Sequence, residues 1–351
     1  MSNIKNVAET AGVSIATVSN VLRGAKPVSP RLRKKVLDAV ELLNYRADPI
    51  ASGLKSKRLN TVALVLTRIE NQFFPYIIDG IQRVTEPLGY SISFFISNNR
   101  VSLEKQHVLS LLNSHVAGIV LNSVAEPGDA EYFNMLASQS RQRKPVHIVS
   151  LERDFRRYGI DSVVIDNLLG GKMATDHLFD MGAQKIAHIA APETAPWGRQ
   201  RLEGYKVSLA EHNAPFRLSC VASGDFLPAS GYAQTRGFLL NGAEFDSVFA
   251  ANDMMAIGAV KALLEYGLNV PDDVMVIGYD NIFLASLITP PLSSVHVPIR
   301  RMGEEAAQML VNRIENNNIP PDGEPAYLEL PISLTPRRST NAPVNIGWEL
   351  Y

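Results

Sequence analysis

Residues 4–22, IKNVAETAGVSIATVSNVL, predict two short helices joined by a tight turn. The first helix carries one apolar face at helical spacing, formed by Ile4, Val7, Ala8 and Ala11. Gly12 stands where a left-handed residue ends a helix. Ser14 is a candidate N-cap for a second helix over residues 15–22. Two helices separated by about four residues are typical of a helix-turn-helix.

A third helix is expected shortly after this pair. Ser29 is its candidate cap, and Pro30 takes the first helical position, where a missing N–H costs nothing. The apolar positions of this helix are Val36, Leu37, Val40 and Leu43. The outward side chains of the second helix are short enough to enter a DNA major groove: Ile15, Ala16, Thr17, Ser19 and Asn20. A plain helical bundle with a basic surface is the alternative interpretation.

The charge of the chain is divided unevenly. Residues 1–60 hold eleven Lys and Arg against four Asp and Glu, whereas the remainder holds 23 basic and 31 acidic side chains. The net charge of −1 hides this division. Because Lys and Arg neutralise phosphates, a basic segment on an acidic body is typical of a head that binds a polyanion. A solvated charged face would give the same count.

From residue 61 onward, short β-branched runs alternate with amphipathic segments. Strands are expected at 61–66, 91–97, 117–123, 146–151, 162–166, 185–190, 247–251 and 274–279. Helices lie between them, for example at 75–88, 102–113, 171–181, 199–211 and 254–266. This alternation predicts an α/β fold with parallel sheets covered on both faces. So many strands favour two lobes, with a ligand cleft at the carboxyl ends of the strands.

The chain closely resembles the lactose-repressor (LacI/GalR) family of transcriptional regulators. The likeness begins with IKNVAETAGVSIATVSNVL and VSPRLRKKVLDAVELLNY (28–45) and covers essentially the whole chain. Further matching stretches are FFPYIIDGI (73–81), VVIDNLLGG (163–171), RLEGY (201–205), AANDMMAIGAV (250–260), VPDDVMVIGYDN (270–281) and LTPRRST (334–340). The resemblance implies a three-helix helix-turn-helix head and a two-lobed periplasmic-binding-protein-like body. It also implies a sequence-specific DNA-binding regulator, expected to be a repressor.

The resemblance assigns the contacts to double-stranded DNA. Base edges would be met by Ile15, Ala16 and Asn20, and phosphates by Asn6, Ser14, Thr17 and Ser19. Asn20 is suited to a bidentate bond with adenine. In residues 48–60, Leu54 matches a leucine that enters the minor groove from a hinge helix. Gly53 costs such a helix about 1 kcal/mol relative to alanine, so it should fold on DNA; an ordinary basic linker is the alternative.

The same mapping assigns a small-molecule effector site. Its expected residues are Phe73, Phe74, Glu152, Arg153, Trp197, Arg199, Phe226, Asn252 and Asp280. Arg199 matches an arginine that holds hydroxyls or a carboxylate in forked geometry, and Asp253 is expected only to cap the following helix. The two phenylalanines have core or inter-lobe packing as an alternative role. Ala195 stands where purine-binding relatives have an arginine, which favours a sugar or sugar acid.

Domain boundaries follow from these matches. We expect the head at 1–47, a hinge or linker at 48–60, an effector-binding and dimerisation domain at 61–340, and a tail at 341–351. The N-lobe would take 61–166 and 296–324, and the C-lobe 167–295 and 325–340. The crossovers would lie near Asn167, Val295 and Glu324. Two heads in a homodimer would bind a near-palindromic operator because of their two-fold symmetry.

Other protein classes are disfavoured. The single cysteine suits a reducing compartment, and neither a signal peptide nor a run of about 18 apolar residues is present, so a cytoplasmic protein without a membrane partner is expected. The seven histidines lack metal-ligand spacing, and no cofactor is expected. No G-x-G-x-x-G, P-loop or G-x-S-x-G is found, so we expect no enzyme and no catalytic residues. The alternatives are a head fused to a sugar-handling enzyme and a corepressor-dependent regulator of purine type.

Overall fold

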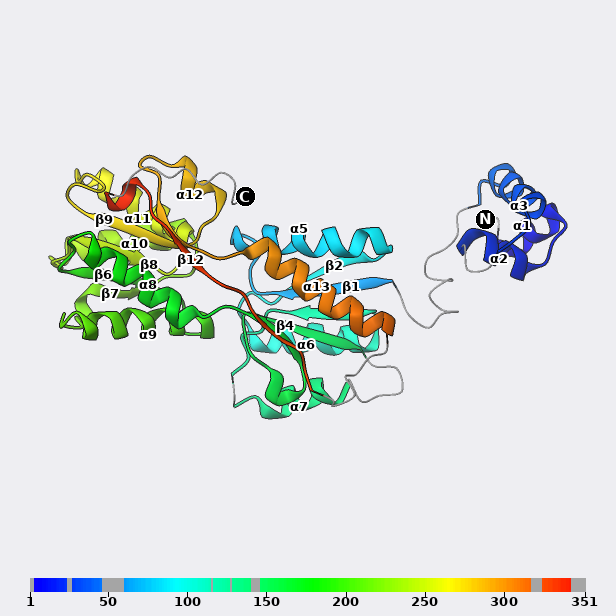
Figure 1. Ribbon diagram of the computed structural model, residues 1–351, viewed down its shortest axis with the longest axis horizontal. Coiled ribbons are helices and arrows are strands. Elements are labelled where there is room, and N and C mark those ends of the chain that lie inside the picture. The colour runs from blue at the N-terminus through cyan, green and yellow to red at the C-terminus, as the bar shows by residue number, and fades with distance from the viewer. Residues whose placement is uncertain are drawn as a thin grey trace. The chain divides into compact units, whose positions relative to one another are not determined.

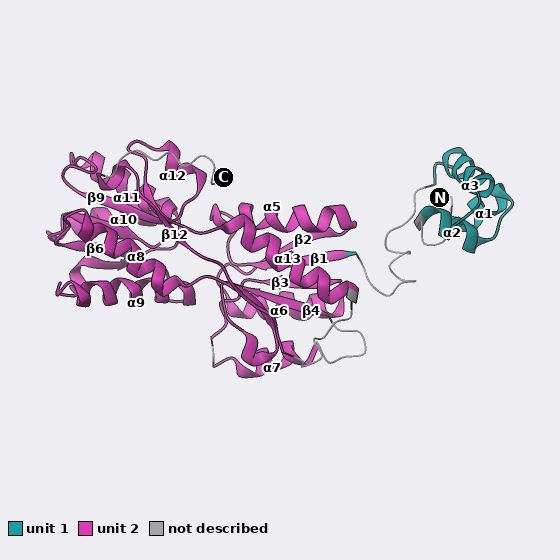
Figure 2. Ribbon diagram, in the orientation of Figure 1, with its two compact units in different colours: residues 1–60 teal, residues 61–351 magenta. Residues whose placement is uncertain are grey.

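The computed structural model describes residues 3–23, 27–45, 60–114, 116–126, 128–139, 146–316 and 324–341. The chain forms two compact units, Met1–Asn60 and Thr61–Tyr351 (Figure 2).

The first unit is a three-helix head with α1 (Ile4–Ala11), α2 (Ile15–Arg23) and α3 (Pro30–Leu42). One fully buried valine from each helix, Val7, Val18 and Val36, meets in its core. Gly12 ends α1 in the left-handed conformation with φ 63°, and the Ser14 hydroxyl accepts the Thr17 backbone N–H at 3.1 Å. Both predicted signals are therefore confirmed. Pro30 does begin α3, but the Ser29 side chain makes no capping hydrogen bond within the described residues.

The second unit contains two six-stranded sheets (Figure 1). The N-lobe sheet has the order β11-β5-β4-β3-β1-β2 and is parallel throughout. Its strands are β1 (Thr61–Leu66), β2 (Ser91–Ile96), β3 (Gly118–Leu121), β4 (His147–Leu151), β5 (Asp161–Val164) and β11 (Tyr327–Glu329). Four central strands, β1, β3, β4 and β5, are almost wholly buried, which explains their continuous apolar runs.

The C-lobe sheet has the order β12-β10-β9-β8-β6-β7. Its strands are β6 (Ile186–Ala190), β7 (Val221–Ser223), β8 (Ser247–Ala250), β9 (Met275–Asp280), β10 (Ser293–His296) and β12 (Ser333–Thr335). All pairs are parallel except that of β10 with β12.

Helices cover both faces of each sheet. The N-lobe has α5 (Phe73–Thr85), α6 (Val101–Asn113), α7 (Ala130–Gln139) and α13 (Ile299–Asn316). The C-lobe has α8 (Asn167–Asp180), α9 (Pro196–Glu211), α10 (Pro228–Leu240), α11 (Asp253–Glu265) and α12 (Phe283–Leu287). Helices α8 and α9 approach so closely that a Cβ on Gly204 would overlap the Leu168 carbonyl oxygen. The predicted α/β fold with parallel sheets is confirmed.

The chain passes between the lobes at residues 165–166, 297–298 and 330–332, where successive elements change sheet (Figure 1). The expected third crossover at Glu324 is too early, because β11 still belongs to the N-lobe sheet. Four short strands, β7, β10, β11 and β12, were not predicted. Helices α8 and α9 begin at Asn167 and Pro196 rather than at Gly171 and Arg199, since Asp166 caps the first and Pro196 opens the second.

Candidate functional site

The head presents its predicted DNA-contacting residues on and around α2. Ala16 is exposed, Ile15 is 36% exposed, and Thr17, Ser19 and Asn20 are half-buried. Exposed Asn6 closes a capping box with Asn3, whose backbone N–H donates to Asn6 Oδ1 at 3.0 Å. The Ser14 and Thr17 hydroxyls bond each other at 2.9 Å. The surface thus offers short polar and apolar groups beside one helix. Leu54 lies outside the described residues.

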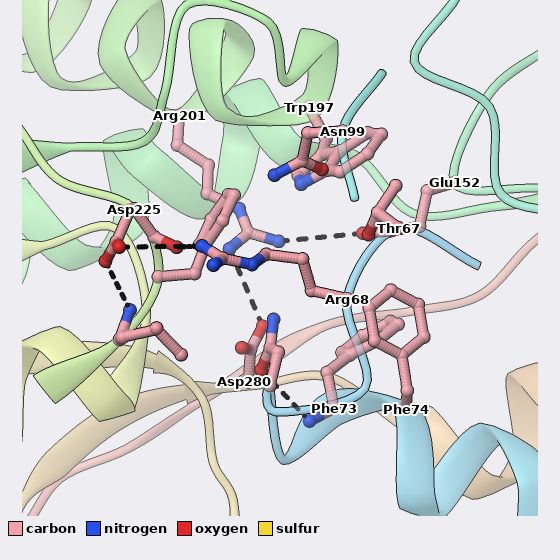
Figure 3. A pocket seen from close by; sticks show the side chains of 13 residues that line it. Thr67, Arg68, Phe73, Phe74, Asn99, Glu152, Trp197, Arg201, Asp225 and Asp280 are labelled. Carbon is pink, nitrogen blue, oxygen red and sulfur yellow. Dashed lines mark hydrogen bonds and ion pairs between the residues drawn. The ribbon is translucent and has the colours of Figure 1, made fainter. Parts of the chain in front are cut away.

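The body holds a pocket where the carboxyl ends of strands from both lobes meet (Figure 3). It is lined by Thr67, Arg68, Asn71, Phe73, Phe74, Asn99, Glu152, Trp197, Arg201, Asp225, Phe226, Leu227 and Asp280. Phe73 and Phe74 form an edge-to-face pair with ring centroids 5.4 Å apart, at the start of α5. Of the predicted effector residues, six therefore lie together: Phe73, Phe74, Glu152, Trp197, Phe226 and Asp280.

Arg201 of α9 is the charged centre of this pocket. Its guanidinium donates to Asn167 Oδ1 at 2.9 Å and to the Ala251 carbonyl at 2.6 Å, and it stacks 3.7 Å from the Tyr279 ring centroid. It also lies 3.8 Å from Glu152 and 3.6 Å from Asp280. Glu152 follows a strand of the N-lobe and Asp280 ends a strand of the C-lobe. The buried arginine therefore joins the two lobes electrostatically.

The buried carboxyls titrate abnormally. Burial raises the pKa of Glu152, and it lifts the pKa of Asp280 well above the usual range; in both cases the Arg201 guanidinium opposes the shift. Oδ1 of Asp280 is buried and accepts no hydrogen bond from a described residue. A protonated carboxyl group can both donate and accept a hydrogen bond. The buried carboxyl groups of Glu152 and Asp280 are therefore suited to hydroxyl groups.

Three predicted residues lie away from the pocket lining. Arg199 is 44% exposed and donates to both Glu126 carboxylate oxygens at 2.8 and 3.0 Å and to the Glu193 carbonyl. Arg153 donates to the carbonyls of Ser123 and Ala125 and stacks over Phe155. Asn252 is fully buried; its Oδ1 accepts the Met255 N–H, and its Nδ2 donates to the Phe226 carbonyl. Asn252 positions Phe226 rather than lining the pocket.

The capping prediction for Asp253 is wrong. Asn252 is the N-cap of α11, whereas Asp253 is the first helical residue. Its carboxylate accepts the Ser294 hydroxyl at 2.6 Å and the Ile282 N–H at 2.7 Å. Asp253 therefore ties α11 to the segment after β9 and to β10, the strand that leads into the second crossover.

A second cavity of about 600 Å³ adjoins the pocket, and Glu152 and Trp197 line both spaces. Arg153, Arg199 and Glu126 line this cavity. The pocket itself is nearly filled by side chains and leaves about 10 Å³ free. A ligand would therefore have to displace side chains or move the lobes to enter this pocket.

Arg201, Arg68, Asn99 and Asp225 were missed as pocket residues. Arg201 lies in the RLEGY stretch that matches the family, but the ligand-binding arginine of the family was assigned to Arg199 instead. Arg68, Asn99 and Asp225 follow β1, β2 and β7, and the rule that ligands bind at carboxyl ends of strands would have included them.

The described residues contain no group of three or more His, Cys, Asp or Glu placed to hold a metal ion. No described helix combines the length and hydropathy needed to cross a membrane.

Comparison with known proteins links both units to one family. Residues 3–48 match the model for bacterial regulatory proteins of the lacI family, and residues 175–340 match the periplasmic binding protein-like domain. The chain is 32% identical to the HTH-type transcriptional repressor PurR of Mannheimia succiniciproducens, over 91% of this chain and 93% of the relative. It is also 32% identical to the ribose operon repressor of Escherichia coli K12, over 90% and 93%.

Two solved structures of transcriptional regulators support the same family assignment. The Lac repressor dimer bound to operator and the anti-inducer ONPF superimposes with a TM-score of 0.84 at 28% identity, covering 97% of this chain and 99% of that one. The complex of the regulator CelR with cellobiose gives a TM-score of 0.69 at 32% identity, covering 97% and 100%. The chain therefore belongs to the lacI family of bacterial regulatory proteins, and it is a transcriptional repressor with a helix-turn-helix DNA-binding head and an effector-binding body.

Proposed function

We propose that the effector of this repressor is a sugar or sugar acid bound between the two lobes. The observation that carries the proposal is the pocket itself, in which aromatic rings from both lobes surround a floor of carboxyl, amide and guanidinium groups. Rings of Phe73 and Trp197 suit the apolar face of a sugar, and Glu152 and Asp280 suit its hydroxyls. Two relatives support the same class: a ribose operon repressor and a regulator in complex with cellobiose.

The effector acts by changing the relative orientation of the two lobes. Arg201 contacts groups of both lobes, so a ligand that competes for Glu152 or Asp280 alters the arrangement of the two lobes. A ligand shifts such an equilibrium only by its difference in affinity for the two states. We propose that this difference sets operator affinity in a cytoplasmic homodimer with one head for each half-site. We expect no turnover of the bound sugar.

The test has two stages. A duplex is first selected from a random pool with the full chain, and light scattering determines whether a dimer binds it. Thermal unfolding is then followed with neutral sugars, sugar acids and phosphosugars, because a bound ligand raises stability by RT ln(1 + [L]/Kd). A compound that raises the melting temperature should also change the affinity for the selected duplex. Stabilisation by purine bases instead of sugars would reject the proposal.

A further inference from the structure

Arg68 extends into the effector pocket from the N-lobe (Figure 3). It follows β1, which ends at Leu66, and its side chain is 29% exposed. Across the cleft it faces Asp225, which follows β7 of the C-lobe. Arg68 lies outside the sequence stretches that match the lactose-repressor family, so it was not among the predicted effector residues.

The guanidinium of Arg68 is loosely held. Its Nη1 lies 3.5 Å from both the Asp225 carbonyl oxygen and Asp225 Oδ2, and its Nε lies 4.0 Å from Glu70. Charge-assisted hydrogen bonds of guanidinium groups are typically about 2.7–2.9 Å long. Arginine has five N–H donors, so most of the hydrogen-bonding capacity of Arg68 is not taken up by the described residues.

The other pocket arginine differs in this respect. Arg201 makes short bonds to Asn167 and Ala251 and is flanked by two buried carboxyls. Each of its three guanidinium nitrogens therefore already faces an acceptor within the protein. An additional anion in the pocket would find Arg68 rather than Arg201 available.

Asp225 bonds only part of the Arg68 guanidinium. Its Oδ1 accepts the Leu227 N–H at 3.0 Å, and its own N–H donates to Ser230 Oγ at 3.0 Å. These bonds fix the carboxylate within its loop, so it reaches Arg68 only through Oδ2 and the backbone carbonyl. The remaining N–H groups of Arg68 have the forked geometry that binds a carboxylate or phosphate in bidentate fashion.

We propose that Arg68 is a specificity-determining residue of the effector pocket and that it binds a carboxylate or phosphate group carried by the effector. This inference rests on the proposed function and narrows it from sugars in general to anionic sugars. The aromatic rings and the buried carboxyl groups would bind the sugar ring. Arg68 would bind the charged substituent of that sugar.

The test uses matched ligands that differ in charge. Isothermal titration of the full chain compares glucose with glucuronate and glucose 6-phosphate, galactose with galacturonate and galactose 6-phosphate, and ribose with ribose 5-phosphate. The wild-type chain should prefer a charged member over its neutral partner, and the carboxylate and phosphate arms distinguish the two sources of charge. Arg68→Gln should weaken the charged member roughly 10- to 100-fold, the range for a lost charge-assisted hydrogen bond. It should leave the neutral member nearly unchanged.

Two further variants sharpen the result. Asp225→Asn should strengthen binding of the charged member because it removes the competing carboxylate. Lys185→Gln removes a positive charge from an exposed ion pair with Glu244 away from the pocket, so it should leave the preference intact. Equal weakening of both members by Arg68→Gln would show that Arg68 only helps to close the lobes, and it would overturn the inference, as would a wild-type preference for the neutral sugar. If no sugar of either charge binds, the proposed function itself fails, and this inference fails with it.

Discussion

The Arg201 guanidinium and the Glu152 carboxylate belong to different lobes, yet they lie 3.8 Å apart and both are buried. A buried charge that loses its partner is strongly destabilising, by about 3–5 kcal/mol. This pair therefore links the stability of the body to the arrangement of its two lobes.

The first prediction concerns which arginine serves the effector. Arg201→Lys keeps a positive charge in the pocket but loses the planar fork, so we expect a folded protein whose operator affinity no longer responds to effector. Arg199→Ala removes only a partly exposed ion pair with Glu126, and such pairs contribute about 0–1 kcal/mol. Its effector response should persist. Operator binding with and without effector measures both variants, and loss of the response in Arg199→Ala alone would restore Arg199 to the site.

Arg201 was not predicted as a pocket residue for a geometric reason. Successive residues of an α-helix are rotated by about 100°, so two positions along α9 separate side chains by about 200°. An assignment displaced by two residues therefore moves an arginine from the buried face to the exposed one. Helical periodicity could not separate the two positions, because the buried side of α9 also carries the polar residues Arg201 and Ser208.

The long buried strands were predictable because their apolar runs are continuous. The strands β7, β11 and β12 have three residues each and partly exposed side chains, so they carry too few residues for any periodicity. The pairing of β11 and β12 depends on crossovers that bring distant segments together. The contact of Arg68 with Asp225, 157 positions apart in sequence, is likewise fixed by the tertiary fold alone.

The second prediction concerns base recognition by the head. Asn20→Ala should relax the preference at one operator position by roughly 1–3 kcal/mol, the value of a bidentate amide–adenine contact. Thr10→Ala, on the exposed side of α1, is the control and should keep the preference. Selection of duplexes from a random pool by each variant gives the comparison. An unchanged preference in Asn20→Ala would remove that residue from the base contacts.

The third prediction compares two helical glycines. Gly204→Ala puts a methyl group onto the Leu168 backbone carbonyl and should destabilise the C-lobe by about 1–3 kcal/mol, because backbone cannot move aside cheaply. Gly237 of α10 has no heavy atom within 4 Å of an added Cβ among the described residues. Gly237→Ala should stabilise by about 0.5–1 kcal/mol through helix propensity. Urea unfolding of both variants is the measurement; equal effects would mean that α8 and α9 are not in close contact.

The last prediction concerns pH. Burial raises the pKa of Asp253 to about 7, although Ser294 and Ile282 donate to its carboxylate. A carboxyl whose pKa is higher in the folded protein contributes stability that is full below the unfolded pKa and is lost as pH rises through the folded value. Its contribution should therefore decline between about pH 4 and pH 7, by about 1.4 kcal/mol per unit.

Asp253→Asn tests this directly, because an amide does not titrate and its oxygen still accepts a hydrogen bond. Between pH 5 and pH 8 the free energy of unfolding of the wild-type chain should fall by about 3 kcal/mol relative to that of the variant. Asp272→Asn, an exposed change in the same lobe, should follow the wild-type curve. Parallel curves for the wild type and Asp253→Asn would mean that the carboxylate is ionised in the fold throughout this range. The hydrogen bonds to Ser294 and Ile282 would then outweigh the cost of burying its charge.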